Sequence, residues 1–243
     1  MDFEASLQEY GKEGIGPDGR EASFGYCFNY FQASRESAMI SELANPSNLQ
    51  VSCLQLGFYL ASWGMLRGSA ELLQRSARHL IPVIRVIAGT DRSVWEIDAH
   101  CYTEANIQLL LGLATEIRTA LDAARSDTLL TKIMLGVFGS VPAFDDNFRA
   151  ACPAEGLCAT FGPKALRKIG QFYHANKDAI ETKRLGFATF DFDSGNPTPR
   201  TYTRAKAIDM AFYIAGEKAN KLKKASKASF KSAGANPRHQ FSA

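Results

Sequence analysis

The sequence of 243 residues lacks any apolar run long enough to cross a membrane, and it has only four histidines and five cysteines. Because residues 1–4 lack the basic segment of a secretory signal, we expect a cytoplasmic protein. An odd number of cysteines in apolar surroundings favours reduced, buried thiols. These cysteines are Cys27, Cys53, Cys101, Cys152 and Cys158. No pair of them has the spacing of a zinc or iron–sulfur site, so we expect no metal and no other cofactor.

Activated nucleophiles of the serine or cysteine type are missing as well. The four histidines are scattered, and no serine or cysteine has the sequence context of such a nucleophile. A serine or cysteine hydrolase therefore finds no support. Hydrophobic residues make up 46% of the chain and charged residues 22%, which is ordinary for a globular protein. The length allows one large domain or two small ones.

The net charge of +3 is unevenly distributed along the chain. Residues 217–243 contain seven basic residues and one acid, so they carry +6 and leave −3 for residues 1–216. We therefore expect one helical unit over 1–216 and a basic, flexible tail over 217–243. Such tails bind phosphate groups without sequence preference, and Lys221, Lys223 and Lys224 are the candidate DNA contacts. A tail that only improves solubility has the same composition.

Apolar residues recur at helical intervals almost throughout, which predicts an all-α protein. Helices are expected over 24–43, 49–63, 69–76, 80–87, 99–124, 163–173 and 203–215, and around Lys132 and Asp145. Ser47 is the expected N-cap of the second helix, which is nearly all apolar and is expected to be the most buried, and Gly216 is the expected end of the last. Residues 185–192 alone alternate as a strand does, and Gly195 and Pro197 end that stretch.

The most informative segment is 131–148, in which a helix bearing Lys132 is followed by a Gly-Ser-Val-Pro turn. Projection of 129–138 at 3.6 residues per turn places Lys132 opposite the apolar face. Gly136 and Gly139 flank it, which leaves room for a ligand to approach the amine. The alternative is a lysine that simply faces solvent.

Asp145 opens the next helix, and Pro142 suits the turn or the first turn of that helix. A lysine and a carboxylate brought together by a tight helix–turn–helix can supply an amine nucleophile with a charge-stabilising partner. That pair suits chemistry in which positive charge develops on a sugar carbon. The alternative is that Asp145 only complements the helix dipole.

Residues 142–148, Pro-Ala-Phe-Asp-Asp-Asn-Phe, together with Thr131-Lys132 resemble the catalytic segment of the helix-hairpin-helix (HhH-GPD) DNA glycosylases. The resemblance implies that Asp145 supports departure of the base. It implies that Lys132 attacks C1′ to form a Schiff base, followed in many members by strand cleavage. The glycine-rich hairpin that precedes the lysine in this family is absent, because 127–130 reads Asp-Thr-Leu-Leu.

The last helix resembles the closing helix of the archaeal 8-oxoguanine glycosylase branch, in which an acid and an aromatic residue line the base pocket. The resemblance implies these roles for Asp209 and Tyr213, whose i, i+4 spacing places them on one helix face. The alternative is an amphipathic helix with Asp209 in solvent.

The corner at 59–69 combines an aromatic residue, two glycines and an arginine. Trp63 could stack on a flipped base while Arg67 holds a phosphate or a base edge. A core tryptophan beside a helix-capping arginine is the alternative. Gly64 and Gly68 are compatible with a roomy pocket.

We therefore predict a two-lobed, all-α fold like that of the HhH-GPD glycosylases, with the terminal helices in one lobe, about 80–175 in the other, and a cleft between them. The expected function is excision of a flipped, modified base from double-stranded DNA, leaving an abasic site. The catalytic residues are Lys132 and Asp145; Trp63, Asp209 and Tyr213 form the base pocket; and Arg67 and Asn147 contact DNA. The family implies either 8-oxoguanine in base-excision repair or, in the bacterial anti-phage members, glucosylated hydroxymethylcytosine.

Two other classes of function stay open. One is a non-catalytic DNA-binding or defence-associated helical protein, in which Lys132 contacts phosphate and Asp145 caps a helix. It predicts salt-sensitive DNA binding without an abasic product. The other is a helical interaction module whose tail binds an acidic partner, and it predicts that removal of 217–243 abolishes most of the function.

Overall fold

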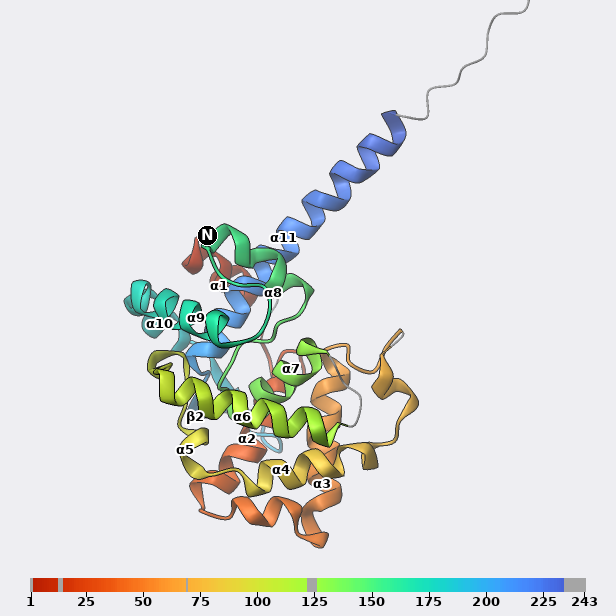
Figure 1. Cartoon of the computed structure of the whole chain (residues 1–243), viewed down its shortest axis with the longest axis vertical. Helices are drawn as coiled ribbons and strands as arrows, with labels where there is room; N and C mark the ends of the chain where they lie inside the picture. The colour runs from red at the N-terminus through yellow and green to blue at the C-terminus, as the bar shows by residue number, and fades with distance from the viewer. Residues whose placement is uncertain (1, 13–14, 69, 122–125, 234–243) are drawn as a thin grey trace, which may run out of the picture.

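The computed structural model describes residues 2–12, 15–68, 70–121 and 126–233, and these are predominantly helical, which confirms the all-α prediction (Figure 1). The α-helices are α1 (Phe3–Lys12), α2 (Ala22–Glu36), α3 (Pro46–Ser62), α4 (Ile81–Gly89), α5 (Arg92–Trp95), α6 (Glu104–Ala120), α7 (Asp127–Phe138), α8 (Asp146–Ala151), α9 (Pro163–Ala175), α10 (Lys177–Arg184) and α11 (Arg204–Ala233). Short 3₁₀ turns are η1 (Ile40–Ala44), η2 (Glu71–Gln74), η3 (Ala77–Leu80), η4 (Ala99–Cys101) and η5 (Cys152–Glu155). None of the described helices is long and apolar enough to span a membrane.

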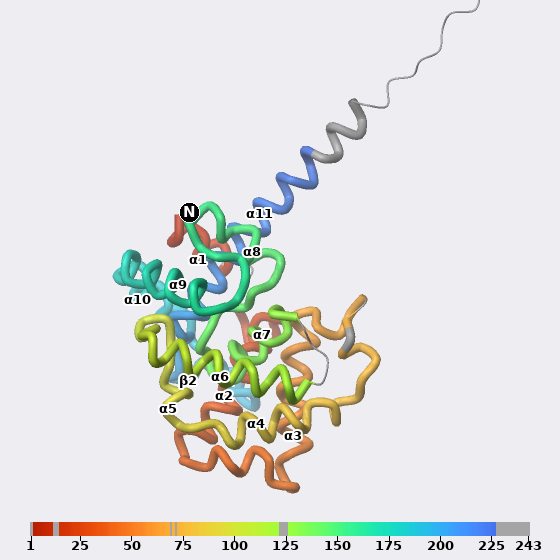
Figure 2. The backbone as a smooth tube through the Cα atoms, viewed as in Figure 1, coloured from red at the N-terminus to blue at the C-terminus, as the bar shows by residue number. Residues whose placement is uncertain are grey.

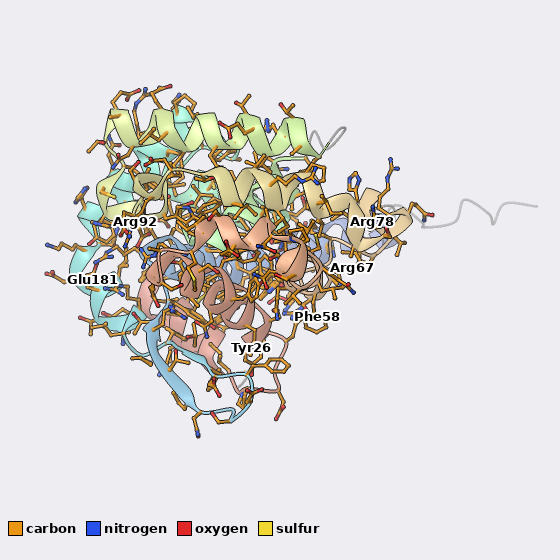
Figure 3. All side chains as sticks on the ribbon, turned by 90° about the horizontal axis from the view of Figure 1, so that it is seen from below. Tyr26, Phe58, Arg67, Arg78, Arg92 and Glu181 are labelled. Atoms are coloured by element: carbon orange, nitrogen blue, oxygen red, sulfur yellow. The ribbon has the colours of Figure 1, made fainter. Side chains whose placement is uncertain are left out.

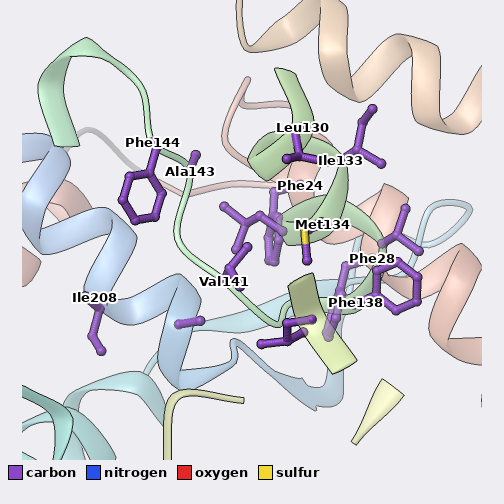
Figure 4. Close-up of a cluster of buried hydrophobic side chains, with 14 of the residues drawn as sticks. Phe24, Phe28, Leu130, Ile133, Met134, Phe138, Val141, Ala143, Phe144 and Ile208 are labelled. Carbon is purple, nitrogen blue, oxygen red and sulfur yellow. The ribbon is translucent and has the colours of Figure 1, made fainter. Parts of the chain in front are cut away.

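Helix α7 is the centre of the core, because every residue from Leu129 to Phe138 is buried. It packs against α2, α3 and α6, and aromatic side chains of α2 close around it (Figure 4). The prediction that the helix at 49–63 is the most buried is wrong. Its counterpart α3 leaves Leu54 50% and Phe58 69% exposed, whereas α7 has neighbours on all its sides.

Local capping chemistry explains where the helices differ from their predicted bounds. Asn45, not Ser47, caps α3, because the Asn45 side chain accepts from the Ser47 amide at 3.1 Å and Pro46 occupies the first turn. The expected helix over 24–43 ends at Glu36, since the chain turns back at Ala38 with φ of 57°. The one expected over 99–124 divides because Thr103 caps α6, whose described part ends at Ala120; residues 122–124 lie outside the described chain.

The strand-like stretch at 185–192 contains β1 (Ala188–Phe190), which pairs antiparallel with β2 (Pro197–Thr201). The sequence reading missed β2, because prolines at both 197 and 199 argue against a strand. This hairpin has room for them at an edge. The hairpin docks on α2, where the Asn29 amide donates to the Phe190 carbonyl at 3.0 Å.

Helix α11 continues far beyond its expected end and extends away from the rest of the chain (Figure 1, Figure 2). Gly216 lies inside this helix, where a Cβ would come 1.7 Å from the Asn147 carbonyl oxygen. The glycine therefore permits close contact with α8 and does not end the helix. Residues 217–233 are helical where a flexible tail was expected, and 234–243 lie outside the described residues.

The packing of the helices decides what surrounds the site. Helices α1 and α8 both pack on α11, while α2 and α3 pack on α7. Both groups combine a helix of the predicted middle lobe, 80–175, with a helix outside it, since α8 packs on α11 and α7 on α2. The connection from α7 to α8 therefore runs from one group of helices to the other. The division into two lobes stays a prediction.

Candidate functional site

Lys132 and Asp145 form an ion pair, with Lys132 Nζ 3.3 Å from Asp145 Oδ2. Lys132 projects from the middle of α7 and is only 4% exposed. Asp145 is the N-cap of α8, and its Oδ1 accepts from the amides of Asn147 and Phe148 at 3.1 and 3.0 Å. One carboxylate oxygen thus caps a helix, while the other faces the amine.

The segment between the two residues is longer and straighter than the tight turn expected from the sequence. Gly139, with φ of 64°, ends α7. A buried segment that is neither helix nor β-strand, residues 140–144, then leads to Asp145. The Phe144 amide donates to Thr131 Oγ1 at 2.8 Å, and Thr128 Oγ1 donates to the Phe144 carbonyl at 2.9 Å. Hydrogen bonds to α7 therefore replace a turn, and Pro142 lies in this segment rather than in the first turn of α8.

The ion pair lines a pocket of about 590 Å³. Its wall also includes the end of α3 with the loop after it, the start of α8, and α11. Six residues singled out from the sequence meet there: Trp63, Arg67, Lys132, Asp145, Asn147 and Tyr213. Segments as far apart in the chain as Trp63 and Tyr213 thus converge on one cavity. Its size is within the range of small-molecule sites, about 300–1,000 Å³.

Trp63 lines the pocket and is only half-buried, so it is not a core tryptophan. Lys132 Nζ lies 5.5 Å from its ring centroid, and Tyr213 meets the ring edge-on at 6.3 Å. The guanidinium carbon of Arg20 lies 4.9 Å from the ring centroid. Trp63 Nε1 is buried and has no hydrogen-bond partner among the described residues. The Trp63 ring is thus in contact both with an aromatic residue, Tyr213, and with two cations, Arg20 and Lys132.

Arg20 is a pocket residue that the sequence reading missed. It precedes α2, far from the motif, and its side chain is half exposed. Its hydrogen bond to Glu21, at 3.1 Å, fixes it beside Trp63. No local sequence signal distinguishes Arg20 from an ordinary surface arginine, because its position depends on how α2 meets α3.

Asp209 does not line the pocket, which corrects the expectation that it lies beside Tyr213 in a base site. Its side chain is buried and accepts from Lys206 Nζ at 2.9 Å and from the Ala143 amide at 2.9 Å. The two residues do share one broad face of α11, but only Tyr213 reaches the cavity. Lys206 was also missed, although a lysine three positions before an acid in an apolar helix is a usable signal of a buried pair.

The glycines around Lys132 allow close packing instead of leaving room for a ligand. A Cβ on Gly136 would come 2.3 Å from Tyr59 Cε1, and one on Gly139 would come 2.5 Å from Thr203 Cγ2. The expectation of an open approach beside these glycines is therefore wrong, and so is that of a solvent-facing Lys132. Access to the amine comes from the side of Trp63.

The predicted DNA contacts are spread over two surfaces. Arg67 is exposed at the pocket rim, on the same side of the molecule as Phe58 and Arg78 (Figure 3). Asn147 also lines the pocket, and its Oδ1 accepts from the side-chain Nδ2 of Asn220 at 3.0 Å. The three lysines predicted to contact DNA, Lys221, Lys223 and Lys224, do not line the cavity and lie on the projecting part of α11. There Lys221 pairs with Glu217 at 3.1 Å, and Lys223 and Lys224 are exposed.

Burial also sets the protonation of the phenols behind the pocket. The pKa of Tyr59 lies well above its usual range, because burial disfavours the phenolate and the charge of Asp209 adds to this effect. The same two causes raise the pKa of Tyr10. The negative charges near Lys132 are therefore carboxylates, because these phenols stay neutral.

All five cysteines are free; Cys27, Cys53 and Cys152 are buried, and Cys101 and Cys158 are half-buried. Among the described residues, no group of three or more His, Cys, Asp or Glu side chains could hold a metal ion. The chain matches no protein-family model, no curated protein and no solved structure, so its resemblance to the glycosylases depends on the motif residues alone.

Proposed function

We propose that this protein is a DNA glycosylase that binds a flipped, modified base in the Trp63 pocket and cleaves its N-glycosidic bond. The observation that carries the proposal is the Lys132–Asp145 ion pair at the wall of an aromatic pocket. A buried amine beside a carboxylate, open to a cavity, has the groups that glycosidic chemistry needs. The two-lobed fold of the HhH-GPD glycosylases belongs to this proposal.

In the proposed reaction, Lys132 Nζ attacks C1′ of the flipped nucleotide. The ammonium must first lose a proton, and the Asp145 carboxylate at 3.3 Å is placed to accept this proton and to pass it to the leaving base, which restores the carboxylate. The Nζ–C1′ bond forms as the bond from C1′ to the base breaks. The C1′–O4′ bond then opens, with an amine proton passing to O4′, to give the Schiff base. Asp145 also stabilises the positive charge that develops on the sugar. If water is the nucleophile instead, Asp145 directs it and Lys132 supplies only charge.

Recognition of the base falls to the aromatic wall. Trp63 offers a ring for stacking and Tyr213 an edge, while Arg67 and Asn147 at the rim are suited to the DNA backbone. Lys221, Lys223 and Lys224 extend the basic surface along α11. The pocket exceeds the lower end of the range for small-molecule sites, which supports a base with a substituent, such as 8-oxoguanine or glucosylated hydroxymethylcytosine.

The proposal is tested on four DNAs: unmodified, 8-oxoguanine-containing, uracil-containing and phage DNA with glucosylated hydroxymethylcytosine. Abasic sites are measured by aldehyde labelling. We expect sites on one modified DNA, and none with Asp145→Asn. Asp91→Asn is the matched control, because Asp91 also caps a helix by accepting from the amide of Ser93, at 2.8 Å, but lies away from the pocket. No sites on any of the four DNAs would refute the proposal.

The role of Lys132 is tested separately by borohydride trapping, which reduces a Schiff base to a stable amine. We expect the wild type to be trapped on the modified DNA and Lys132→Ala not to be trapped. Trapping that persists in Lys132→Ala would exclude Lys132 as the nucleophile. Abasic sites without trapping in the wild type would assign the attack to water.

A second candidate function is non-catalytic DNA binding. It is favoured by the nearly complete burial of Lys132 and by the helix-capping role of Asp145, since both residues have a structural use. It predicts binding that weakens steeply with salt and no abasic product on any DNA.

A further inference from the structure

A second buried ion pair lies next to the pocket. Lys206, in the first turn of α11, is 2% exposed, and its Nζ donates to Asp209 Oδ2 at 2.9 Å. Three aromatic rings surround the ammonium: their centroids lie at 4.9 Å for Phe24, 5.0 Å for Trp63 and 5.8 Å for Tyr10. The cation is thus held by a carboxylate and by ring faces, without contact with the cavity.

The other oxygen of Asp209 holds the chain that leads to Asp145. Asp209 Oδ1 accepts from the Ala143 amide at 2.9 Å, two residues before Asp145. The next amide, that of Phe144, is held by Thr131 on α7. Two consecutive amides are therefore fixed from opposite sides, one by α11 and one by α7. Together they determine where Asp145 begins α8 and faces Lys132.

A buried ion pair is not an efficient way to stabilise a protein, because desolvation offsets most of the attraction. The position of this pair offers another reason for it. Trp63 lies within 5.0 Å of Lys206 Nζ and within 5.5 Å of Lys132 Nζ, so one ring contacts both ammonium groups. The pair therefore touches the two parts of the site that need exact placement, the aromatic wall and the acid.

We propose that Lys206 and Asp209 are positioning residues of the pocket. Asp209 holds the Ala143 amide and thereby places Asp145 against Lys132, and Lys206 fixes the Asp209 carboxylate and the Trp63 ring. The kinetic consequence rests on the proposed glycosylase function, but the geometric one does not. Asp209 accordingly acts through Asp145 rather than by touching the base.

Two double variants isolate the Ala143 hydrogen bond. Both Lys206→Met/Asp209→Asn and Lys206→Met/Asp209→Leu remove the same two charges. Only the asparagine keeps an oxygen that can accept from the Ala143 amide. Replacement of a buried pair by neutral or apolar residues is often tolerated, and thermal melting verifies that each variant folds. Any difference between the two variants then reports the hydrogen bond rather than the charge.

The readout is the placement of Asp145, measured through the amine of Lys132. Formaldehyde and cyanoborohydride methylate only uncharged amines, and mass spectrometry gives the extent of methylation of Lys132 at each pH. The Asp145 carboxylate, 3.3 Å from the amine, favours the ammonium, so displacement of Asp145 should let methylation of Lys132 begin at lower pH. Exposed Lys164 on α9 is the internal control and should react alike in all variants.

We expect the asparagine variant to follow the wild type and the leucine variant to react at lower pH. In abasic-site assays, the leucine variant should lose turnover by about 10²-fold with little change in KM for DNA. Identical Lys132 profiles in the two folded variants would overturn the positioning role. If the leucine variant does not fold, Asp209→Glu moves the carboxylate by one methylene; it should shift the profile in the same direction, and an unchanged profile would again refute the role.

These outcomes are separable from failure of the proposed function. Absence of abasic sites with the wild type refutes the glycosylase, while the methylation comparison still decides whether Asp209 places Asp145. Conversely, a wild-type glycosylase whose two variants methylate alike leaves the function intact and removes only the positioning role.

Discussion

The two lysine–aspartate pairs of this protein are chemically alike but have different surroundings. Lys132–Asp145 and Lys206–Asp209 have side-chain exposures of 5% and 19% against 3% and 12%, and both amines approach Trp63. Only the first pair lines the cavity. Burial alone therefore does not separate a reactive pair from a supporting one.

The two pairs also differ in what the second carboxylate oxygen of each aspartate, Oδ1, contacts. Asp145 Oδ1 accepts from two amides at the start of α8, whereas Asp209 Oδ1 accepts from the Ala143 amide between the helices. The aspartate of the first pair therefore caps the start of α8 at the cavity. The aspartate of the second pair connects α11 to the segment that leads to Asp145. In the proposed arrangement, the pair at the cavity depends on a second pair that does not line the cavity.

The largest effect is expected when the pair at the cavity loses its charge. Asp145→Asn should lower the rate of base excision by about 10²–10⁴-fold, because the carboxylate both accepts a proton and stabilises the sugar cation. Its thermal stability should change little, since asparagine is also a good N-cap. Single-turnover rates on the modified DNA measure the effect. An equal loss of rate in Asp91→Asn would trace it to helix capping instead.

Removal of the lysine amine from either pair should lower the free energy of unfolding by a different amount. Lys206→Met leaves Asp209 charged in a largely buried position, so the free energy of unfolding should fall by about 3–5 kcal/mol. Lys132→Met should cost less, because Asp145 lines the cavity, where water can solvate it, and still caps α8. Urea unfolding of both variants provides the measurement. A larger loss for Lys132→Met would reverse the comparison.

Close packing of α8 on α11 should matter for both pairs. Gly216→Ala places a methyl group against the Asn147 backbone, which cannot move aside as a side chain can, and we expect a loss of about 1–3 kcal/mol or more. Gly112→Ala is the control, because nothing lies within 4 Å of its Cβ position in α6. It should stabilise the protein by up to about 1 kcal/mol. Equal melting temperatures for the two variants would contradict the close contact.

The smallest effect concerns acid stability at the start of α11, the helix that carries the supporting pair. Burial raises the pKa of Glu181, but hydrogen bonds from Tyr173, Arg184 and Arg204 outweigh it and lower the pKa from 4.5 to about 2. A lowered pKa stabilises the fold above pH 4.5, and this contribution is lost as the pH falls to about 2. The stability difference between wild type and Glu181→Gln should therefore shrink over this window.

Urea unfolding at several pH values measures that difference, and Glu116→Gln on the exposed face of α6 controls for the loss of one charge. A difference that stays constant between pH 4.5 and 2 would show that the hydrogen bonds do not hold the Glu181 carboxylate in its charged form.

Much of the site was readable from the sequence because its parts are local motifs. The Lys132–Asp145 pair follows from thirteen residues of spacing across a helix end, and Trp63 stands out at a corner with two glycines and an arginine. Tyr213 was singled out only through the resemblance of the last helix to the closing helix of a glycosylase branch. The role of Asp209 was misjudged because helix periodicity gives a face but not the partner that it meets. Arg20 gave no local signal, whereas the spacing of Lys206 to Asp209 in an apolar helix was a usable signal that was overlooked.

The sequence by itself determined the helical class, since apolar residues at intervals of three and four can be buried only by helices. It also determined the two residues of the candidate chemistry. Only the tertiary structure decided which pair faces the cavity, that Gly136 and Gly216 serve close packing, and that β2 completes a hairpin. These three features depend on contacts between segments that are far apart in the chain. The pattern of apolar residues in the sequence indicates which face of a segment is buried, but not which other segment packs against that face.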